Sequence, residues 1–273
     1  MFEFLSCIAV LLPIRPLFFF GIALLLLGAG PAAQAQDATP NETPSYRKEF
    51  TYGINFNTRG GLIGGVNVRS TRVLNDKWSR FWSIEGVEAK HPKEQRIGNQ
   101  FTGGTYVLNK SNYMFVVRPS FGAQRVVFRK APESGVQVNA LLGGGPSVAL
   151  LMPYNIYYDY TERIGGRPGG PEDIRTEQFD PALHGDSQFI VDRAPLFSGA
   201  NDVKPSAGVH LRGALSFEYG RYRDAVAGIE TGFLFEYFPS RPTILRATGI
   251  SDAKLNETFF PSVYLTIYLG TRN

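Results

Sequence analysis

The stretch that decides the fold is Phe259-Phe-Pro-Ser-Val-Tyr-Leu-Thr-Ile-Tyr-Leu-Gly270. Every second residue from Val263 to Leu269 is aliphatic, and the residues between them, from Ser262 to Tyr268, all carry a hydroxyl group. Because side chains alternate across a β-strand, a period of two predicts a strand with one aliphatic face and one polar face. The two faces therefore meet different surroundings.

Seven further segments alternate in the same way, namely residues 50–59, 62–74, 78–90, 112–129, 136–160, 205–222 and 225–238. Together with the last segment they predict an all-β protein, an antiparallel transmembrane β-barrel of eight strands with apolar residues outward and polar residues in the lumen. Pro119 and Gly143–Pro146 interrupt two of the longer segments, where we expect a bend or bulge. Splitting both segments would give ten strands, which is the second choice.

The lengths of the connections support the barrel. The links 75–77, 130–135 and 223–224 are short, whereas 91–111, 161–204 and 239–256 are long, and only the link after the first strand breaks the alternation. Short turns on the periplasmic side and long loops outside are typical of an even-stranded outer-membrane barrel. A soluble periplasmic β domain, the competing interpretation, gives no reason for this order.

The front of the chain predicts export. An apolar run from Phe18 to Leu27 follows Arg15, and Ala33-Gln34-Ala35 has small residues where a signal peptidase cleaves. We therefore expect a signal peptide over 1–35, a flexible periplasmic leader over 36–49 and the barrel domain over 50–273. The alternative, a transmembrane anchor, needs roughly 20 apolar residues, and this run is shorter. Cys7 is the only cysteine, so the mature chain would have no disulfide.

Composition agrees with an all-β protein and excludes several kinds of site. The chain has 30 Gly, 18 Pro, 21 Phe and 13 Tyr, which suits turns and aromatic girdles. Its net charge is +4, with no basic cluster interleaved with aromatics, so we expect no nucleic-acid partner. No glycine motif has the strand–helix context of a nucleotide site, and no metal-ligand spacing occurs, so we expect no cofactor and no metal.

Four short motifs carry a resemblance: Asn57-Thr-Arg-Gly-Gly61, Lys90-His-Pro-Lys-Glu94, Pro119-Ser-Phe-Gly122 and Leu151-Met-Pro-Tyr154. With them the chain resembles small outer-membrane β-barrel proteins, and in particular an uncharacterised barrel-like family of the Bacteroidetes lineage. The resemblance implies a fold and no activity. One departure is the ending Thr271-Arg272-Asn273, because many outer-membrane barrels end in an aromatic residue that the insertion machinery reads.

Ionisable residues at predicted lumen positions form the main candidate site, which we call the lumen network: Arg69, Glu85, Arg118, His210, Arg212, Glu218, Glu230 and Glu236. An eight-stranded barrel has a narrow interior that side chains fill. Arginine and carboxylate groups in such an interior should pair, because either alone would be costly to bury. We therefore predict a structural network that plugs the barrel; a gated pore or proton path through the same charges is the alternative.

The three histidines are the only candidates for catalysis by a lipid-modifying barrel enzyme or a surface protease. His91 lies in the first long loop, and His184 precedes Gly185-Asp186 in the longest one. His210 is expected in the periplasmic half of its strand, away from external lipid. The cations Lys90, Lys93 and Arg96 could meet lipopolysaccharide phosphates at the loop rim.

These observations predict a non-enzymatic outer-membrane barrel with a plugged lumen and no catalytic residues. It would contact outer-membrane lipid, and its loops, chiefly 161–204, would serve surface contact or envelope organisation. The competing functions are a lipid-modifying barrel enzyme and a small gated solute channel.

Overall fold

A computed structural model describes residues 46–60, 64–129, 135–219 and 225–273. The chain divides into two compact units, Met1–Glu42 and Thr43–Asn273, and the first lies outside the described residues. So do the predicted signal peptide, its cleavage site, most of the leader, and the links 130–134 and 223–224.

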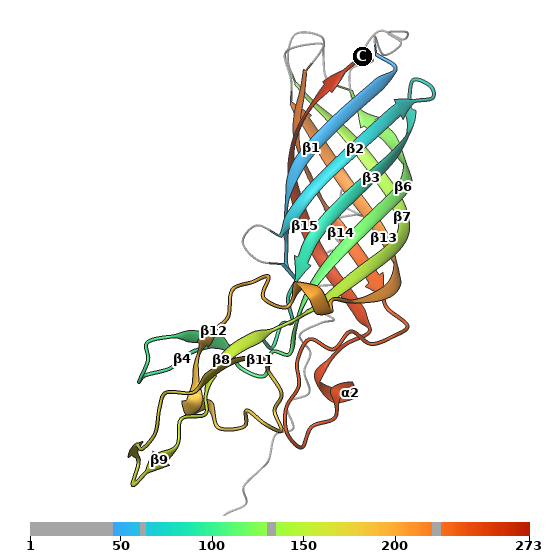
Figure 1. Cartoon of the computed structure of the whole chain (residues 1–273). Coiled ribbons are helices and arrows are strands. Elements are labelled where there is room, and N and C mark those ends of the chain that lie inside the picture. The colour runs from blue at the N-terminus through green and yellow to red at the C-terminus, as the bar shows by residue number, and fades with distance from the viewer. Residues whose placement is uncertain (1–45, 61–63, 130–134, 220–224) are drawn as a thin grey trace, which may run out of the picture. The chain divides into compact units, whose positions relative to one another are not determined.

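The second unit is built on a closed antiparallel barrel of eight strands (Figure 1). The strands are β1 (Lys48–Asn57), β2 (Gly65–Val73), β3 (Trp78–Ala89), β6 (Asn112–Phe128), β7 (Val136–Pro153), β13 (Lys204–Tyr219), β14 (Ala225–Tyr237) and β15 (Phe259–Arg272). Each pairs with its neighbours in sequence order, and β1 closes the ring against β15 from Glu49 opposite Arg272 to Asn57 opposite Tyr264. The prediction of an eight-stranded all-β barrel is confirmed, and the ten-strand alternative is wrong.

Two local expectations need correction. The β6–β7 register is the same on both sides of Pro119, and the register shift lies instead between Val126 and Phe128. The predicted strand 136–160 is two elements, because β7 ends at Pro153 and β8 (Asn155–Asp159) joins a separate sheet.

The outward face of the barrel is an exposed apolar belt. Large apolar side chains point outward from all eight strands, among them Ile54, Val66, Ile84, Phe121, Leu142, Leu211, Phe233 and Ile267, which are 45–65% exposed. Their lumen-facing neighbours are buried, and many of them are polar or charged. A barrel presents this composition to lipid, since every backbone group is paired within the closed sheet. Among the described residues, no helix is both long enough and apolar enough to cross a membrane.

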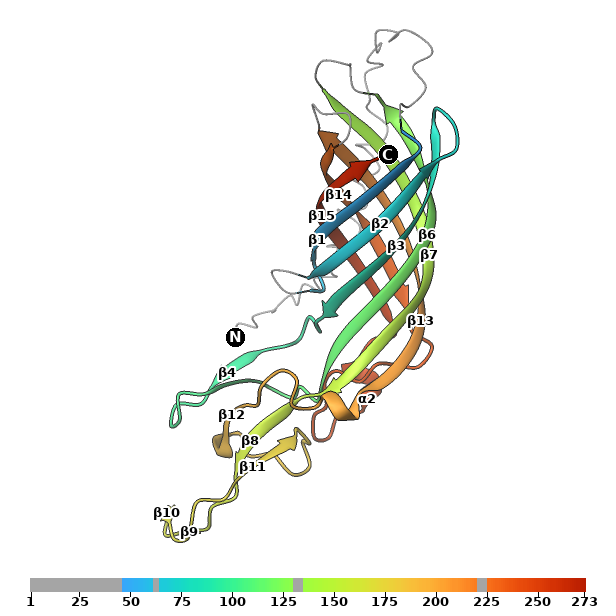
Figure 2. The ribbon, with the colours of Figure 1, turned by 45° about the horizontal axis from the view of Figure 1, so that its top comes forward.

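The long connections fold into ordered structure at the barrel end opposite the C-terminus (Figures 1 and 2). Residues 91–111 and 154–203, which we call the loop module, contain the hairpin β4 (Arg96–Gly98)–β5 (Thr105–Val107), the sheet β11 (Ile174–Gln178)–β8–β12 (Ile190–Arg193) and the hairpin β9 (Arg163–Ile164)–β10 (Arg167–Pro168). The third long connection carries the short helix α2 (Asp252–Leu255). The sequence had indicated only loops there.

The loop module has its own apolar core on the outer side of the barrel rim. Tyr113 and Met152, opposite each other on β6 and β7, pack with module residues. Those residues are Tyr106, Tyr154, Ile156, Tyr158, Phe179 and Ile190. The two parts of the module are joined by Asn99, whose Nδ2 donates to the carbonyls of Gln188 and Ile190 at 3.1 and 2.8 Å. The module is therefore fixed to the barrel wall by packing and hydrogen bonds.

Candidate functional site

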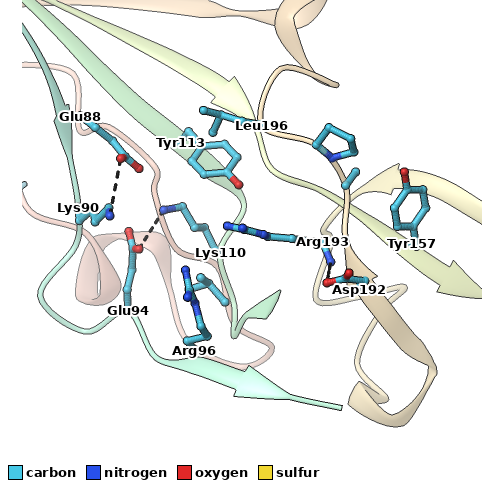
Figure 3. Close-up of a pocket in the computed structure, with 13 residues that line it drawn as sticks. Glu88, Lys90, Glu94, Arg96, Lys110, Tyr113, Tyr157, Asp192, Arg193 and Leu196 are labelled. Atoms are coloured by element: carbon cyan, nitrogen blue, oxygen red, sulfur yellow. Dashed lines mark hydrogen bonds and ion pairs between the residues drawn. The ribbon is translucent and has the colours of Figure 1, made fainter. Parts of the chain in front are cut away.

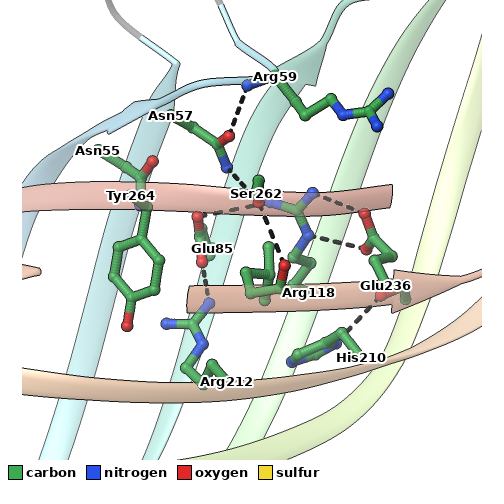
Figure 4. A network of polar contacts seen from close by, with 12 residues as sticks. Asn55, Asn57, Arg59, Glu85, Arg118, His210, Arg212, Glu236, Ser262 and Tyr264 are labelled. Atoms are coloured by element: carbon green, nitrogen blue, oxygen red, sulfur yellow. Dashed lines mark hydrogen bonds and ion pairs between the residues drawn. The ribbon is translucent and has the colours of Figure 1, made fainter. Parts of the chain in front are cut away.

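The structure places all eight residues of the lumen network on the lumen face, each at most 6% exposed. The central group is built around Glu85 on β3 (Figure 4). Its carboxylate pairs with the guanidinium of Arg212 and lies 3.6 Å from that of Arg118. Arg118 in turn donates from Nε and Nη2 to Glu236 at 2.8 and 2.7 Å.

A second pair lies beside this group. Arg69 Nη2 is 2.6 Å from Glu230 Oε2, and the hydroxyl of Tyr264 donates to Glu230 Oε1 at 2.7 Å. The Arg212 guanidinium stands over the Tyr264 ring, 5.4 Å from its centroid, and so connects the two groups. Three arginines thus face three carboxylates, which gives no net charge in this part of the lumen. Buried charges that are paired and hydrogen-bonded are the arrangement that a low-dielectric interior tolerates.

His210 is hydrogen-bonded to two serines. Its Nε2 lies 2.7 Å from the Ser120 hydroxyl and its Nδ1 3.0 Å from the Ser147 hydroxyl. The prediction for its height in the barrel is wrong. Because β13 begins at Lys204 on the loop side, His210 lies in the loop-side half of that strand. Its ring is still enclosed in the lumen, 5% exposed.

Glu218 belongs to a separate cluster near the C-terminus, which the sequence did not reveal. Arg272 donates to Glu218 Oε1 at 2.7 Å and to Glu49 Oε2 at 2.8 and 2.7 Å, and its guanidinium stands 4.1 Å from the centroid of the Tyr46 ring. Arg272 lies near the end of β15 and Glu49 near the start of β1, so this cluster ties the closing seam of the barrel.

The loop-side end of the lumen holds an apolar cluster, which we call the plug. Val87, Ala89, Met114, Val116, Ala149, Phe238, Ile244, Leu245 and Phe260 pack there, with Leu151 against them. Ile244 and Leu245 come from the connection between β14 and β15, and Asn256 holds that connection in place. Its Oδ1 accepts from the backbone N–H groups of both residues at 2.8 and 2.9 Å, and its Nδ2 donates to the Leu245 carbonyl at 2.9 Å.

A pocket of about 560 Å³ opens where the loop module meets the outer side of β3 and β6 (Figure 3). Two of the predicted rim cations line it, Lys90 and Arg96, whereas Lys93 does not. Lys110 and Arg193, both missed from the sequence, line it too. Lys110 is 2% exposed, pairs with Glu94 at 2.9 Å and stands 4.7 Å from the centroid of the Tyr113 ring.

The charges of this pocket are unequally matched. Lys90 lies 3.7 Å from Glu88, and Asp192 accepts from the backbone N–H groups of Thr105 and Arg193. Within the described part of the chain, the guanidinium groups of Arg96 and Arg193 have no carboxylate partner. Both point into the pocket in Figure 3. The Arg193 side chain hydrogen-bonds to Tyr113, a neutral partner that leaves its charge unbalanced. Two guanidinium groups without a carboxylate partner can bind a phosphate, sulfate or carboxylate group in bidentate fashion.

The two loop histidines are buried and held by backbone groups. The Lys93 N–H donates to His91 Nδ1 at 3.2 Å, and burial lowers the pKa of His91. The Asp180 N–H donates to His184 Nδ1 at 2.9 Å, and Glu177 lies 3.4 Å from its Nε2. Asp186, its neighbour in the sequence, accepts from Gln188.

In the core of the loop module, burial raises the pKa of Tyr154 to about 12, although its hydroxyl accepts from the Val107 N–H.

Metal-ligating side chains do not gather in residues 46–60, 64–129, 135–219 and 225–273, where no group of three or more His, Cys, Asp or Glu could hold an ion.

No protein-family model and no curated protein matches the sequence. Solved structures similar to the chain include Neisserial surface protein A (NspA), with 9% identity and a TM-score of 0.38 over 85% of this chain and 100% of that one. They also include Ail, the attachment invasion locus protein of Yersinia pestis, with 10% identity and a TM-score of 0.34 over 83% and 97%. A further structure of Ail contains the heparin analogue sucrose octasulfate. Because these scores lie below 0.5, the barrel assignment rests on the strand pairing of the chain itself.

Proposed function

We propose that this chain is a non-enzymatic outer-membrane β-barrel with a side-chain-plugged lumen, whose loop module serves surface contact or envelope organisation. The observation that carries the proposal is the contrast between the charged groups of the lumen and those of the rim pocket. The lumen charges are paired with one another below an apolar plug, whereas the rim pocket holds two guanidinium groups with no described carboxylate partner.

The proposal includes the route to the membrane. Export would remove residues 1–35 near Ala35 and leave 36–49 as a periplasmic leader before the barrel domain. The exposed apolar belt supports insertion into lipid. Fractionation followed by gel migration of heated and unheated samples tests this step, and a soluble protein with unchanged mobility would end it.

The proposed partner of the rim is a phosphate-bearing lipopolysaccharide. Lys90 and Arg96 support this part, together with Arg193, since all three line a pocket on the outer side of the wall just beyond the apolar belt. The test is binding of purified lipopolysaccharide to the folded protein in neutral detergent. The variant Arg96→Gln/Arg193→Gln should bind at least tenfold more weakly, because charge-assisted bidentate contacts are lost. The control Arg167→Gln/Arg241→Gln removes two exposed loop arginines outside the pocket and should bind like the wild type.

The enzyme alternative requires a histidine that reaches lipid. His91 and His184 are each 2% exposed, and their Nδ1 atoms accept from backbone N–H groups, which supports a structural role. Mass spectra of lipid A from cells carrying His91→Ala or His184→Ala should match those from wild-type cells. A changed acyl pattern in either variant would favour the enzyme.

Residues of the short sequence motifs make contacts that give the motifs a structural role. The Asn57 side chain accepts from the Arg59 N–H, the Glu94 side chain from the His91 N–H, and Gly122 leaves room for the Phe81 ring. These contacts give three of the four motifs a structural role, and the Bacteroidetes-type assignment stays a prediction.

A further inference from the structure

We propose that Lys48, Arg72 and Arg80 form a binding site for the phosphate group of an anionic glycerophospholipid at the end of the barrel that carries the C-terminus. The inference rests on the proposed function, because it places this end in the periplasmic leaflet of the outer membrane. It concerns a different face and a different ligand from the rim pocket.

The three cations form one row across three strands. Lys48 on β1 is directly opposite Arg72 on β2, and Arg72 is directly opposite Arg80 on β3. All three are exposed and share the outward parity of Phe50, Ser70 and Trp82. Neighbouring strands are about 4.8 Å apart, so the three Cα atoms span about 10 Å, within which long flexible side chains can converge on one phosphate.

The row has no internal counter-charge. Like charges directly opposite each other on a sheet are destabilising. Nevertheless, none of the three side chains makes an ion pair with another described residue, and the pocket that they line contains no carboxylate. An external anion would remove this repulsion, and the charge pattern thus selects a ligand of negative charge.

The pocket joins the row to the apolar belt. It measures about 400 Å³ and is lined by the three cations with Ser70, Phe81, Trp82 and Phe121. Trp82 is the next outward residue after Arg80 along β3 toward the loops, and Phe121 lies directly opposite it on β6; their side chains are 50% and 65% exposed. Trp78, the next outward position on β3 toward the barrel end that carries the C-terminus, has the Arg125 guanidinium 5.6 Å from its ring centroid. A cation row bounded by tryptophan is typical of the membrane–water interface, so acyl chains would lie along the belt while the phosphate meets the row.

The experiment uses the full folded chain in a neutral detergent, with folding checked by heat-dependent gel mobility. Native mass spectrometry measures retained lipid after mixing with phosphatidylglycerol, with phosphatidylcholine, or with phosphatidylglycerol plus excess soluble glycerophosphate. The test variant is Lys48→Gln/Arg72→Gln/Arg80→Gln. The control variant Arg167→Gln/Arg241→Gln/Lys254→Gln removes the same number of lysines and arginines from exposed loop positions.

We expect the wild type and the control to retain phosphatidylglycerol at least tenfold better than the test variant, because charge-assisted contacts to the phosphate are lost. Equal retention of phosphatidylcholine and phosphatidylglycerol would overturn recognition of the anion. An equal loss in the control would reduce the effect to bulk charge and overturn the site. Full competition by glycerophosphate would overturn the lipid as the source of the phosphate.

A second variant separates binding from folding. Arg72→Glu places a carboxylate between Lys48 and Arg80, so it should fold at least as well as the wild type and yet lose phosphatidylglycerol. Retained binding in this variant would contradict the proposal. Since every measurement is made on protein whose mobility shows a folded barrel, failure here leaves the plugged barrel untouched. Failure of the fractionation test, in contrast, would appear as unchanged mobility before any lipid is added, so the two failures are distinguishable.

Discussion

Replacing Glu85 by glutamine should strongly destabilise the folded barrel. The side chain is 1% exposed, pairs with Arg212 and lies 3.6 Å from Arg118. Glutamine keeps the shape but removes the charge, which leaves Arg212 buried without its contacting carboxylate. Arg118 keeps both bonds to Glu236. Breaking one buried pair costs about 3–5 kcal/mol, so we expect a loss of that size from the free energy of unfolding.

The measurement is denaturant unfolding of the barrel reconstituted in lipid vesicles, followed by tryptophan fluorescence and extrapolated linearly to water. Glu88→Gln is the matched control, because Glu88 lies on the outward face of the same strand and its 3.7 Å pair with Lys90 is partly exposed. Exposed pairs contribute about 0–1 kcal/mol, so this variant should unfold nearly like the wild type.

A double variant tests the cause. Glu85→Leu/Arg212→Leu removes both charges of the pair, so neither residue leaves a buried charge without its partner. The double variant should have a higher free energy of unfolding than Glu85→Gln, since apolar replacement of a buried pair is often neutral or stabilising. Equal losses in Glu85→Gln and Glu88→Gln, or a double variant worse than the single one, would refute the interpretation of the lumen network as obligatory pairs.

Three further outcomes are expected. Asn256→Ala should lower the unfolding free energy by about 2–4 kcal/mol and expose the 239–258 connection to protease, because backbone donors of the plug segment lose their acceptor, whereas Asn256→Asp keeps that acceptor and should lose less. Gly122→Ala should cost about 1–3 kcal/mol, since a Cβ there would meet the Leu142 carbonyl and the Phe81 ring, and Phe81→Leu should restore part of it. Burial lowers the pKa of His91 in the folded state, so the unfolded chain binds more protons. The free energy of unfolding should therefore fall as the pH drops below about 6.5, the pKa of an unperturbed histidine. His91→Gln should remove this component when unfolding is measured as a function of pH.

The barrel could be predicted from the sequence because its physical cause acts on every second residue. Lipid outside and ion pairs inside impose opposite chemistry on adjacent positions, as Leu211 and Arg212 illustrate with 54% and 2% exposure. The same parity placed all eight residues of the lumen network on the correct face. It could not give their partners, since Arg118 and Glu236 are 118 residues apart and pair through barrel closure.

The parts that escaped prediction lack such a period. Ile244 and Leu245 fill the lumen from a connection with no alternation, so nothing local distinguishes them from loop residues. Arg272 and Glu49 lie at the two ends of the predicted barrel domain, and only the β1–β15 pairing brings them together. The loop module depends on contacts such as Asn99 with Ile190, which are specified by packing rather than by sequence pattern.

The lumen combines two barriers of different physical kind. In the central network a permeating ion would compete with guanidinium–carboxylate pairs that already satisfy each other, so entry would leave a buried charge uncompensated. On the loop side the plug residues from β3, β6, β7, β15 and the β14–β15 connection carry no titratable group, and Arg59, which stands 5.4 Å from the centroid of the Phe260 ring, is itself paired with Glu257. We therefore propose that the lumen is closed, although its charges suggest a path when only the sequence is considered. The proposed contacts with partners lie on the outer surface of the barrel, where Arg96, Arg193 and the row of Lys48, Arg72 and Arg80 have no described carboxylate partner.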